Sequence, residues 1–151
     1  MSLSAHLKGF PDLPPIWAAG VWLAQQAAAA WAPVLRFDAG WAGTALVAAG
    51  LAAILWAAWW FRAKRTPIEP HHAPRALIVE GPYRLNRNPI YTGLAAILLG
   101  TGLNAGALSS VLLAAAFPPI VTRRFVRPEE AGLRAAFGAE ADAYLSRTRR
   151  W

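Results

Sequence analysis

Residues 39–61, AGWAGTALVAAGLAAILWAAWWF, decide the fold class of this chain. The stretch has no charged side chain, and it is slightly longer than the roughly 20 residues that an α-helix needs to cross a bilayer. Its last residues are Trp59, Trp60 and Phe61, and tryptophan is enriched where a membrane meets water. We therefore predict a spanning helix with an aromatic belt at its end, in an all-α integral membrane protein.

The composition of the whole chain favours the same interpretation. Of its 151 residues, 56% are hydrophobic and only 15% are charged, whereas soluble domains average about 25% charged residues. The absence of cysteine excludes a disulfide framework and a thiol nucleophile. The net charge of +7 would suit nucleic acid, but the basic residues lie between apolar segments. We expect a single domain, residues 1–151, that binds no nucleic acid.

Three further apolar segments bring the expected number of transmembrane helices to about four. They cover residues 14–35, 89–103 and 105–121. The last two are short for a bilayer, and the uncharged turn at residues 102–106 predicts that they form a helical hairpin. A buried or re-entrant helix is the alternative for residues 89–103.

Arginine and lysine side chains predict which side of the membrane each polar segment faces. Residues 62–88 hold six of them and residues 122–151 hold seven, whereas the segment between the first two apolar stretches has only Arg36, close to Asp38. Cytoplasmic segments carry an excess of such residues. We therefore expect both termini to be cytoplasmic, with the two basic segments sharing one face of the membrane.

Residues 80–93, EGPYRLNRNPIYTG, form the most distinctive pattern in the chain. Asn88-Pro89 is a typical helix start. Tyr83, Arg87 and Tyr91 follow one another at intervals of four, so they would share one helical face if the helical turn reached back that far. Arginine beside aromatic rings at a helix N-terminus suits an anionic ligand with a flat ring. The simpler alternative is that these arginines only anchor the chain to anionic headgroups.

The C-terminal stretch 127–151, RPEEAGLRAAFGAEADAYLSRTRRW, supplies carboxylates near the arginine-rich loop. Leu133, Phe137 and Tyr144 predict the apolar side of a cytoplasmic helical segment that is broken near Gly138. The adjacent glutamates at 129–130 would then stand at its start. The alternative is an interfacial amphipathic helix in which these glutamates are ordinary first-turn residues favoured by the helix dipole.

These elements together carry a family resemblance. TPIEP…ALIVEGPYRLNRNPIYTG followed by RPEEAGLRAAFG…Y…RRW, across residues 66–151, resembles the bacterial branch of the isoprenylcysteine carboxyl methyltransferase family, which is related to the membrane-bound phospholipid N-methyltransferases. The resemblance implies an integral membrane methyltransferase of the bacterial inner membrane that uses S-adenosylmethionine. It also implies that residues 62–88 and 122–151 form the cofactor-binding segments.

The resemblance further implies roles for individual residues. The set assigned to cofactor binding is Val79, Gly81, Tyr83, Arg87, Asn88, Tyr91, Glu129 and Glu130. Arg87 and Glu130 are also assigned to catalysis, and the substrate set is Arg84, Tyr144 and Arg150. Two positions depart from the family pattern: Asn88 replaces a histidine usual in the eukaryotic enzymes, and Ala141 replaces a common tyrosine.

The chemistry of S-adenosylmethionine is consistent with these residue types. Arginine suits its carboxylate, and glutamate suits its ammonium or ribose diol. The methyl group is already activated, so the transfer needs alignment and exclusion of water. No metal is expected, because the adjacent His71 and His72 do not face a single site.

The acceptor is expected to be a membrane lipid or a lipidated molecule, such as a prenylated cysteine or phosphatidylethanolamine. A carboxylate acceptor needs no base, whereas an amine must first lose a proton, for which Glu130 or His72 would serve. Two other functions stay open at this point. One is an NADPH-dependent membrane reductase of the sterol-reductase type, and the other is a non-enzymatic lipid-binding protein.

Overall fold

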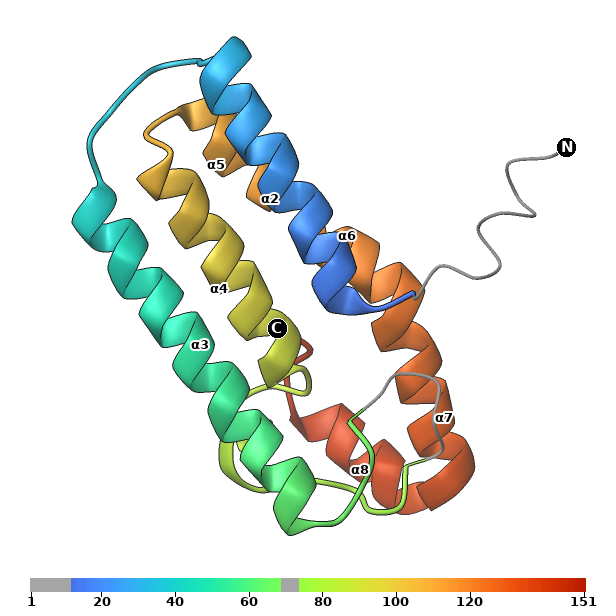
Figure 1. Cartoon of the computed structure of the whole chain (residues 1–151). Coiled ribbons are helices and arrows are strands. Elements are labelled where there is room, and N and C mark those ends of the chain that lie inside the picture. The colour runs from blue at the N-terminus through green and yellow to red at the C-terminus, as the bar shows by residue number, and fades with distance from the viewer. Residues whose placement is uncertain (1–11, 69–73) are drawn as a thin grey trace, which may run out of the picture.

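A computed structural model describes residues 12–68 and 74–151, and these residues form an all-helical protein without a strand. Helices α2 (Pro14–Trp31), α3 (Gly40–Ala63) and α4 (Pro89–Asn104) lie alongside one another (Figure 1). The chain then returns through α5 (Leu108–Ala114), α6 (Phe117–Val121), the π-helical turn η3 (Thr122–Val126) and α7 (Arg127–Phe137), and it ends with α8 (Ala139–Arg147). A 3₁₀ turn, η2 (Gly81–Arg84), precedes α4. The predicted all-α fold class is confirmed.

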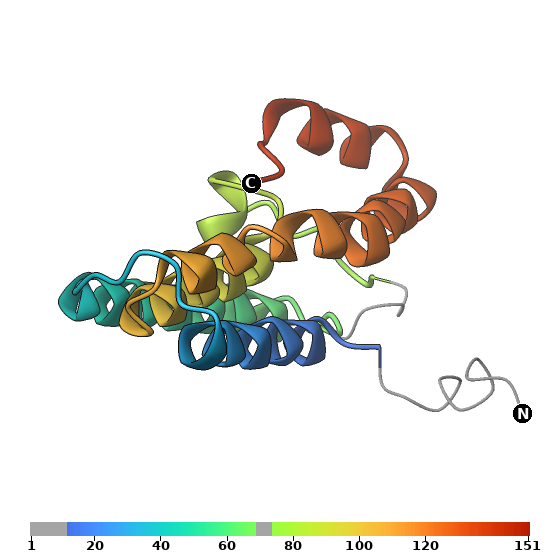
Figure 2. The same ribbon diagram turned by 90° about the horizontal axis from the view of Figure 1, so that it is seen from above.

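The fourth apolar segment differs from the prediction. Residues 105–121 were expected to form one helix, but they form two, α5 and α6. The break lies at Ala115 and Ala116, directly before α6, in which Pro118 and Pro119 follow Phe117. Proline has no backbone N–H to donate, and its ring clashes with the carbonyl four residues earlier. Helix α6 still contacts α2 and α4, and the chain then continues through η3 into α7 (Figure 2).

Helices α3 and α4 are joined along a glycine seam, formed by Gly43 and Gly50 of α3 with Gly100 and Gly93 of α4. A Cβ atom added to Gly50 would lie 2.5 Å from the carbonyl oxygen of Gly93, and one added to Gly43 would lie 2.6 Å from that of Gly100. The glycines are seven residues apart on each helix, so they lie on one face. Small residues at such spacing let helix backbones approach closely. The seam therefore fixes where α4 begins relative to the end of α3.

Gln25 joins α2 to α4 and α5 from within the bundle. Its side chain has no exposed surface. Its amide nitrogen donates to the carbonyl oxygens of Leu98 at 2.7 Å and Ser110 at 2.9 Å. Its side-chain oxygen accepts from the hydroxyl of Thr101 at 2.9 Å, and its backbone carbonyl oxygen accepts from the hydroxyl of Ser110 at 2.7 Å. A buried amide satisfied in this way adds specificity to the packing.

Helix α3 is the one helix, among the described residues, that is long and apolar enough to cross a membrane. Only 11% of its most apolar window is buried inside the protein, and Trp41 and Trp59 are 83% and 58% exposed. A core helix of a soluble protein would be mostly buried, so this face suits contact with lipid. Only part of the predicted aromatic belt faces outward, because Phe61 packs edge-to-face against Tyr83, with 5.9 Å between the ring centroids.

Candidate active site

A cavity of about 890 Å³ lies where the loop before α4, the start of α2 and helix α7 meet. This volume is near the upper end of the range of small-molecule sites, about 300–1,000 Å³. One part of its wall is apolar, and the residues there include Leu13, Pro14, Pro15, Ile54, Ile90, Leu94 and Leu133. The other part is polar, and it contains Tyr83, Arg87, Asn88, Tyr91, Glu129, Glu130 and Tyr144. The cavity can therefore hold a ligand, or two ligands, with both polar and apolar parts.

Arg87 is the centre of an arginine clamp, which we define as Arg87, Glu130 and Arg150 with the carbonyl groups of Leu145 and Thr148. The Arg87 guanidinium donates to the carboxylate of Glu130 at 2.9 Å, to the carbonyl of Thr148 at 2.7 Å and to the carbonyl of Leu145. Its three nitrogens thus all bind protein acceptors. The clamp fastens the loop before α4 to the segment that follows α8.

Glu130 holds the third member of the clamp. Both of its oxygens accept from the guanidinium of Arg150, at 2.9 and 2.8 Å, and only 5% of the residue is exposed. Burial by itself disfavours the charged form, but the hydrogen bonds from Arg150 and Arg87 outweigh it and hold the pKa of Glu130 below its ordinary value. Glu130 is therefore an ionised anchor and a poor proton acceptor.

Backbone contacts extend the clamp on both sides. The backbone N–H of Arg87 donates to the carbonyl of Arg149 at 2.8 Å, and Asn86 forms an isolated parallel bridge with Arg149. The side-chain amide of Asn88 donates to the carbonyl of Arg150 at 2.9 Å. Asn88 is the N-cap residue of α4, as predicted, but its side chain makes no capping bond to this helix. Its amide is instead oriented toward the C-terminal segment.

Glu129 is the carboxylate that remains available at the cavity wall. Its hydrogen bond is with the hydroxyl of Tyr91, which donates at 2.5 Å. Burial raises the pKa of Glu129 to about 7; the nearby charge of Glu130 adds to the rise, and the bond from Tyr91 opposes it. Near neutral pH this carboxyl group changes easily between its neutral and charged forms. A bound cation would favour the charged form.

Two tyrosines close the cavity near the clamp. The hydroxyl of Tyr144 in α8 donates to the carbonyl of Tyr83 in η2 at 2.9 Å, and both residues are buried. Burial raises the pKa of Tyr144 to about 12 and also raises the pKa of Tyr83. Both hydroxyls are therefore neutral at physiological pH and act through hydrogen bonds and ring contacts.

The structure brings most of the sequence-predicted site residues together. Six of the eight cofactor candidates line the cavity, namely Tyr83, Arg87, Asn88, Tyr91, Glu129 and Glu130. Val79 packs against the core cluster of Ile78 and Tyr83 instead. Gly81 has a backbone φ of +57°, and a Cβ there would lie 1.9 Å from the indole nitrogen of Trp60. The requirement for glycine at this position is thus explained by packing.

The three substrate candidates are separated. Tyr144 lines the cavity, Arg84 is exposed outside it, and Arg150 acts through its ion pair with Glu130. His71 and His72 lie outside the described residues.

The condition for one expectation about the site is not met, and one alternative interpretation does not hold. Tyr83, Arg87 and Tyr91 do not share a helical face, because Tyr83 belongs to η2 and α4 begins only at Pro89. A residue before proline is disfavoured in the α conformation. Glu129 and Glu130 lie in the first turn of α7, as predicted, but Val126, the residue before this helix, already has helical geometry, and α7 continues directly from η3. There is thus no free helix N-terminus whose dipole would explain them.

Sequence reasoning missed the apolar wall of the cavity. Leu13 and Pro14 at the start of α2 and Phe61 of α3 reach the site from segments that carry no polar motif, and Leu145 reaches it from α8. The position of Leu145 directly after Tyr144 was the one signal available, because a buried helix turn contributes several neighbouring side chains. The start of α2 had no such signal.

An all-helical fold with a cavity that both charged and apolar side chains line defines a small helical protein for an amphipathic ligand or ligand pair. The chain belongs to the phospholipid methyltransferase family, whose profile matches residues 39–140. This match includes α3, α4 and α7 and leaves α2 outside. In the comparisons no curated protein and no solved structure matched the chain. The family identifies the protein as a methyltransferase of a membrane-associated type.

Proposed function

We propose that the protein transfers a methyl group from S-adenosylmethionine to a lipid-anchored acceptor at the cytoplasmic face of a bacterial inner membrane. The observation that carries the proposal is the cavity itself. Six residues expected at a cofactor site line its polar part, and apolar residues of α2, α3 and α4 line the rest. The family's description adds weight to methyl transfer and to a phospholipid acceptor.

The residues at the polar part fit S-adenosylmethionine. This cofactor supplies a methyl group on a positively charged sulfur atom, so the site must tolerate positive charge. Glu129 is the carboxylate with capacity to pair with the cofactor's ammonium group, because both oxygens of Glu130 are bound by guanidinium groups. The rings of Tyr83 and Tyr91 offer flat apolar surfaces beside it.

Arg87 and Glu130 act in this proposal as positioning residues. Three of the five N–H groups of Arg87 donate to protein acceptors, so at most two remain for a ligand carboxylate. Its contribution is to hold the C-terminal segment against the loop before α4, which excludes water from the cavity. Exclusion of water and alignment of the reactants are what a displacement on an activated methyl group needs.

The proposed membrane arrangement follows from the exposed faces. Helix α3 spans the bilayer, and α2, α4 and the α5–α6 pair pack beside it as the other three crossings. The basic residues after α3 and in η3, α7 and α8 then lie at the cytoplasmic face, together with the cavity. Because the chain has no cysteine, single cysteines at Asp38 and Ser146, both exposed, test this topology. Labelling of both from the same side contradicts it.

Two measurements test the function. Purified protein in detergent is titrated with S-adenosylmethionine, S-adenosylhomocysteine and NADPH. We expect the first two to bind. Binding of NADPH alone contradicts the proposal and favours a membrane reductase. Radiolabelled S-adenosylmethionine is then offered with a total lipid extract and, separately, with soluble thiols and amines. Label confined to water-soluble products contradicts a lipid acceptor.

A further inference from the structure

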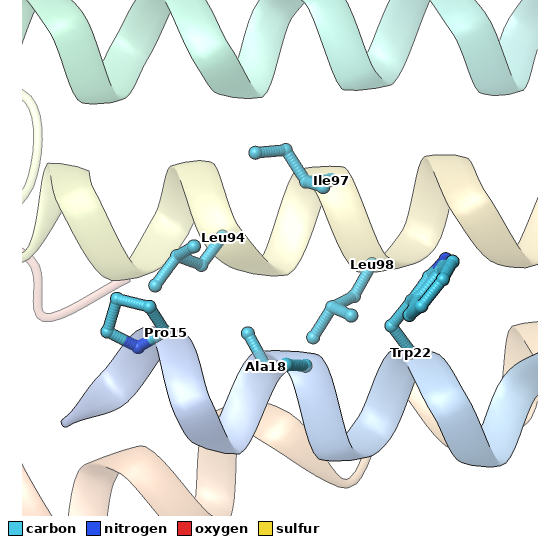
Figure 3. A pocket seen from close by; sticks show the side chains of 7 residues that line it. Pro15, Ala18, Trp22, Leu94, Ile97 and Leu98 are labelled. Atoms are coloured by element: carbon cyan, nitrogen blue, oxygen red, sulfur yellow. The ribbon is translucent and has the colours of Figure 1, made fainter. Parts of the chain in front are cut away.

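A second and smaller hollow, of about 290 Å³, lies between α2 and α4. Its walls are Pro15, Ala18, Ala19 and Trp22 of α2 and Leu94, Ile97 and Leu98 of α4, which we call the α2–α4 groove. In Figure 3, Pro15 and Leu94 lie at one end and Trp22 at the other. Every wall residue is apolar, and Ala19 and Trp22 are exposed on the outer side.

The groove is continuous with the proposed methyl-transfer cavity. Pro15 and Leu94 line both of them, so the end of the groove near these two residues opens beside the cavity's apolar wall. Along α2 the groove runs from Pro15 to Trp22, a distance of roughly 10 Å at the helical rise of 1.5 Å per residue. A ligand whose polar head lies in the cavity can therefore extend an apolar tail along this path.

The far end of the groove lies at Trp22, close to the Gln25 cross-link. Gln25 lies almost one helical turn beyond Trp22, and its amide binds the carbonyl oxygen of Leu98, itself a wall residue of the groove. Its second bond, to Ser110, ties α2 to α5 at the same level. Helices α2 and α4 thus cannot separate further there. The groove has one end at the cavity, a fixed far end and an open side.

The shape of the groove, more than its apolar character, would select a ligand. In a bilayer the surrounding lipid tails are as apolar as the groove, so burial of a tail there gains little from the hydrophobic effect. What the groove offers is a width set by the small Ala18 and Ala19 and a length set by Trp22 and Gln25. Such a channel distinguishes tails by length and branching.

We propose that the α2–α4 groove holds one unbranched hydrocarbon chain of the methyl acceptor and determines which chain lengths are methylated. This inference rests on the proposed function. It concerns α2, which lies outside the residues matched by the family. The eight cofactor candidates all lie within the matched segment. Four of the seven wall residues of the groove are on α2, so changes on this helix can test acceptor selection apart from methyl-donor binding.

Substitutions of alanine on α2 test the proposal. Ala19→Trp fills the groove from its exposed side without touching the buried core, whereas Ala24→Trp places the same side chain on exposed α2 surface away from both hollows. Each protein receives radiolabelled S-adenosylmethionine and the polar lipid extract of the expression host, and mass spectrometry resolves the chain lengths of the methylated products. Binding of S-adenosylhomocysteine is measured in parallel.

The expected result is a shift in the product profile. Ala19→Trp should lower methylation of the longest-chain lipids roughly tenfold, a difference of about 1.4 kcal/mol, while Ala24→Trp and wild type agree. Trp22→Ala, which opens the far end, should shift the products toward longer chains. Equal profiles for wild type and Ala19→Trp overturn this inference and leave the proposed function standing. A wild type that methylates no lipid, or that fails to bind S-adenosylhomocysteine, overturns both.

Discussion

The glycine seam holds α4 against α3, and the arginine clamp holds the loop before α4 against the C-terminal segment. The two contacts use different physical means. In the seam, backbones touch because side chains are absent, so its geometry depends on no charge. In the clamp, a buried carboxylate, two guanidinium groups and backbone carbonyls hold a segment about 60 residues away in the sequence. Added side-chain volume at a glycine would therefore disrupt the seam, whereas loss of a charged group would disrupt the clamp.

This difference separates the fold from the site. Loss of the clamp leaves the α3–α4 pair with its close backbone contacts, but it frees the segment that carries Leu145 and Thr148, which closes the polar side of the cavity. Loss of the seam moves α4 as a whole and with it Tyr91. Variants can therefore be chosen that damage binding and stability to different extents.

The largest effect is expected from Arg87→Ala. This change leaves the buried Glu130 with one partner and removes the donor from two carbonyl groups, which should cost about 3 kcal/mol of stability and abolish S-adenosylhomocysteine binding. Denaturant unfolding in detergent and calorimetric titration measure the two effects. Arg123→Ala, at an exposed arginine outside the cavity, is the control and should change neither. Unchanged affinity in Arg87→Ala would falsify the positioning role of the clamp.

Gly50→Ala is the matching change in the seam. The added Cβ would meet the Gly93 carbonyl at 2.5 Å, so the helices must separate, at a cost of about 2 kcal/mol. Gly20→Ala serves as its control, because a Cβ on this helical glycine meets nothing within 4 Å. Alanine there should raise the free energy of unfolding by up to about 1 kcal/mol. Thermal unfolding compares the two. If both raise the midpoint temperature, the seam does not set the distance between α3 and α4.

The third effect concerns charge at the cavity. Glu129 has a pKa of about 7, and a cofactor ammonium group prefers its ionised form, which increases as pH rises. Binding of S-adenosylhomocysteine should therefore strengthen about tenfold between pH 6 and 8. The other titratable groups that interact with Glu129 are Tyr91, Tyr83 and Glu130. Glu129→Gln should bind weakly with a flat pH profile. A wild-type affinity that falls over this range contradicts the assignment of Glu129 to the ammonium group.

Tyr144→Phe should give the smallest effect and sharpen the boundary of the clamp. It removes the buried bond to the Tyr83 carbonyl and keeps the ring, so we expect a loss of about 1 kcal/mol with little change in affinity. Hydrogen exchange at η2 and α8 would locate the change. Affinity reduced as far as in Arg87→Ala would mean that this tyrosine belongs to the ligand site and not only to its wall.

The sequence predicted the helices well because apolar runs determine where helices form in such a chain. The charge pattern predicted only that two basic segments and a glutamate pair meet on one face, whereas the individual residues of the polar cavity wall came from the family resemblance. Pro118 and Pro119 indicate the break between α5 and α6. Pro89 indicates that α4 starts there and does not extend back to Tyr83. The first prediction followed the apolar run and the second followed the four-residue spacing of Tyr83, Arg87 and Tyr91, and neither took account of the proline.

Other features could not be predicted because they depend on distant backbone groups. Arg87 binds carbonyl oxygens of Leu145 and Thr148, and every residue has a carbonyl, so no sequence pattern marks the partner. The same holds for Gln25 and its acceptors in α4 and α5. The predicted roles of Arg87 and Glu130 in catalysis stay predictions, although their mutual contact favours positioning over contact with the reacting groups.

The buried amide of Gln25 also bears on how the protein enters the membrane during synthesis. Its acceptors, the carbonyls of Leu98 and Ser110, lie 73 and 85 residues later in the chain, so they do not exist when α2 leaves the ribosome. Until then an unpaired amide in hydrocarbon costs several kcal/mol, whereas α3 carries no such group. On the proposed topology, α2 therefore waits at the insertion machinery or the interface and settles only when α4 and α5 arrive.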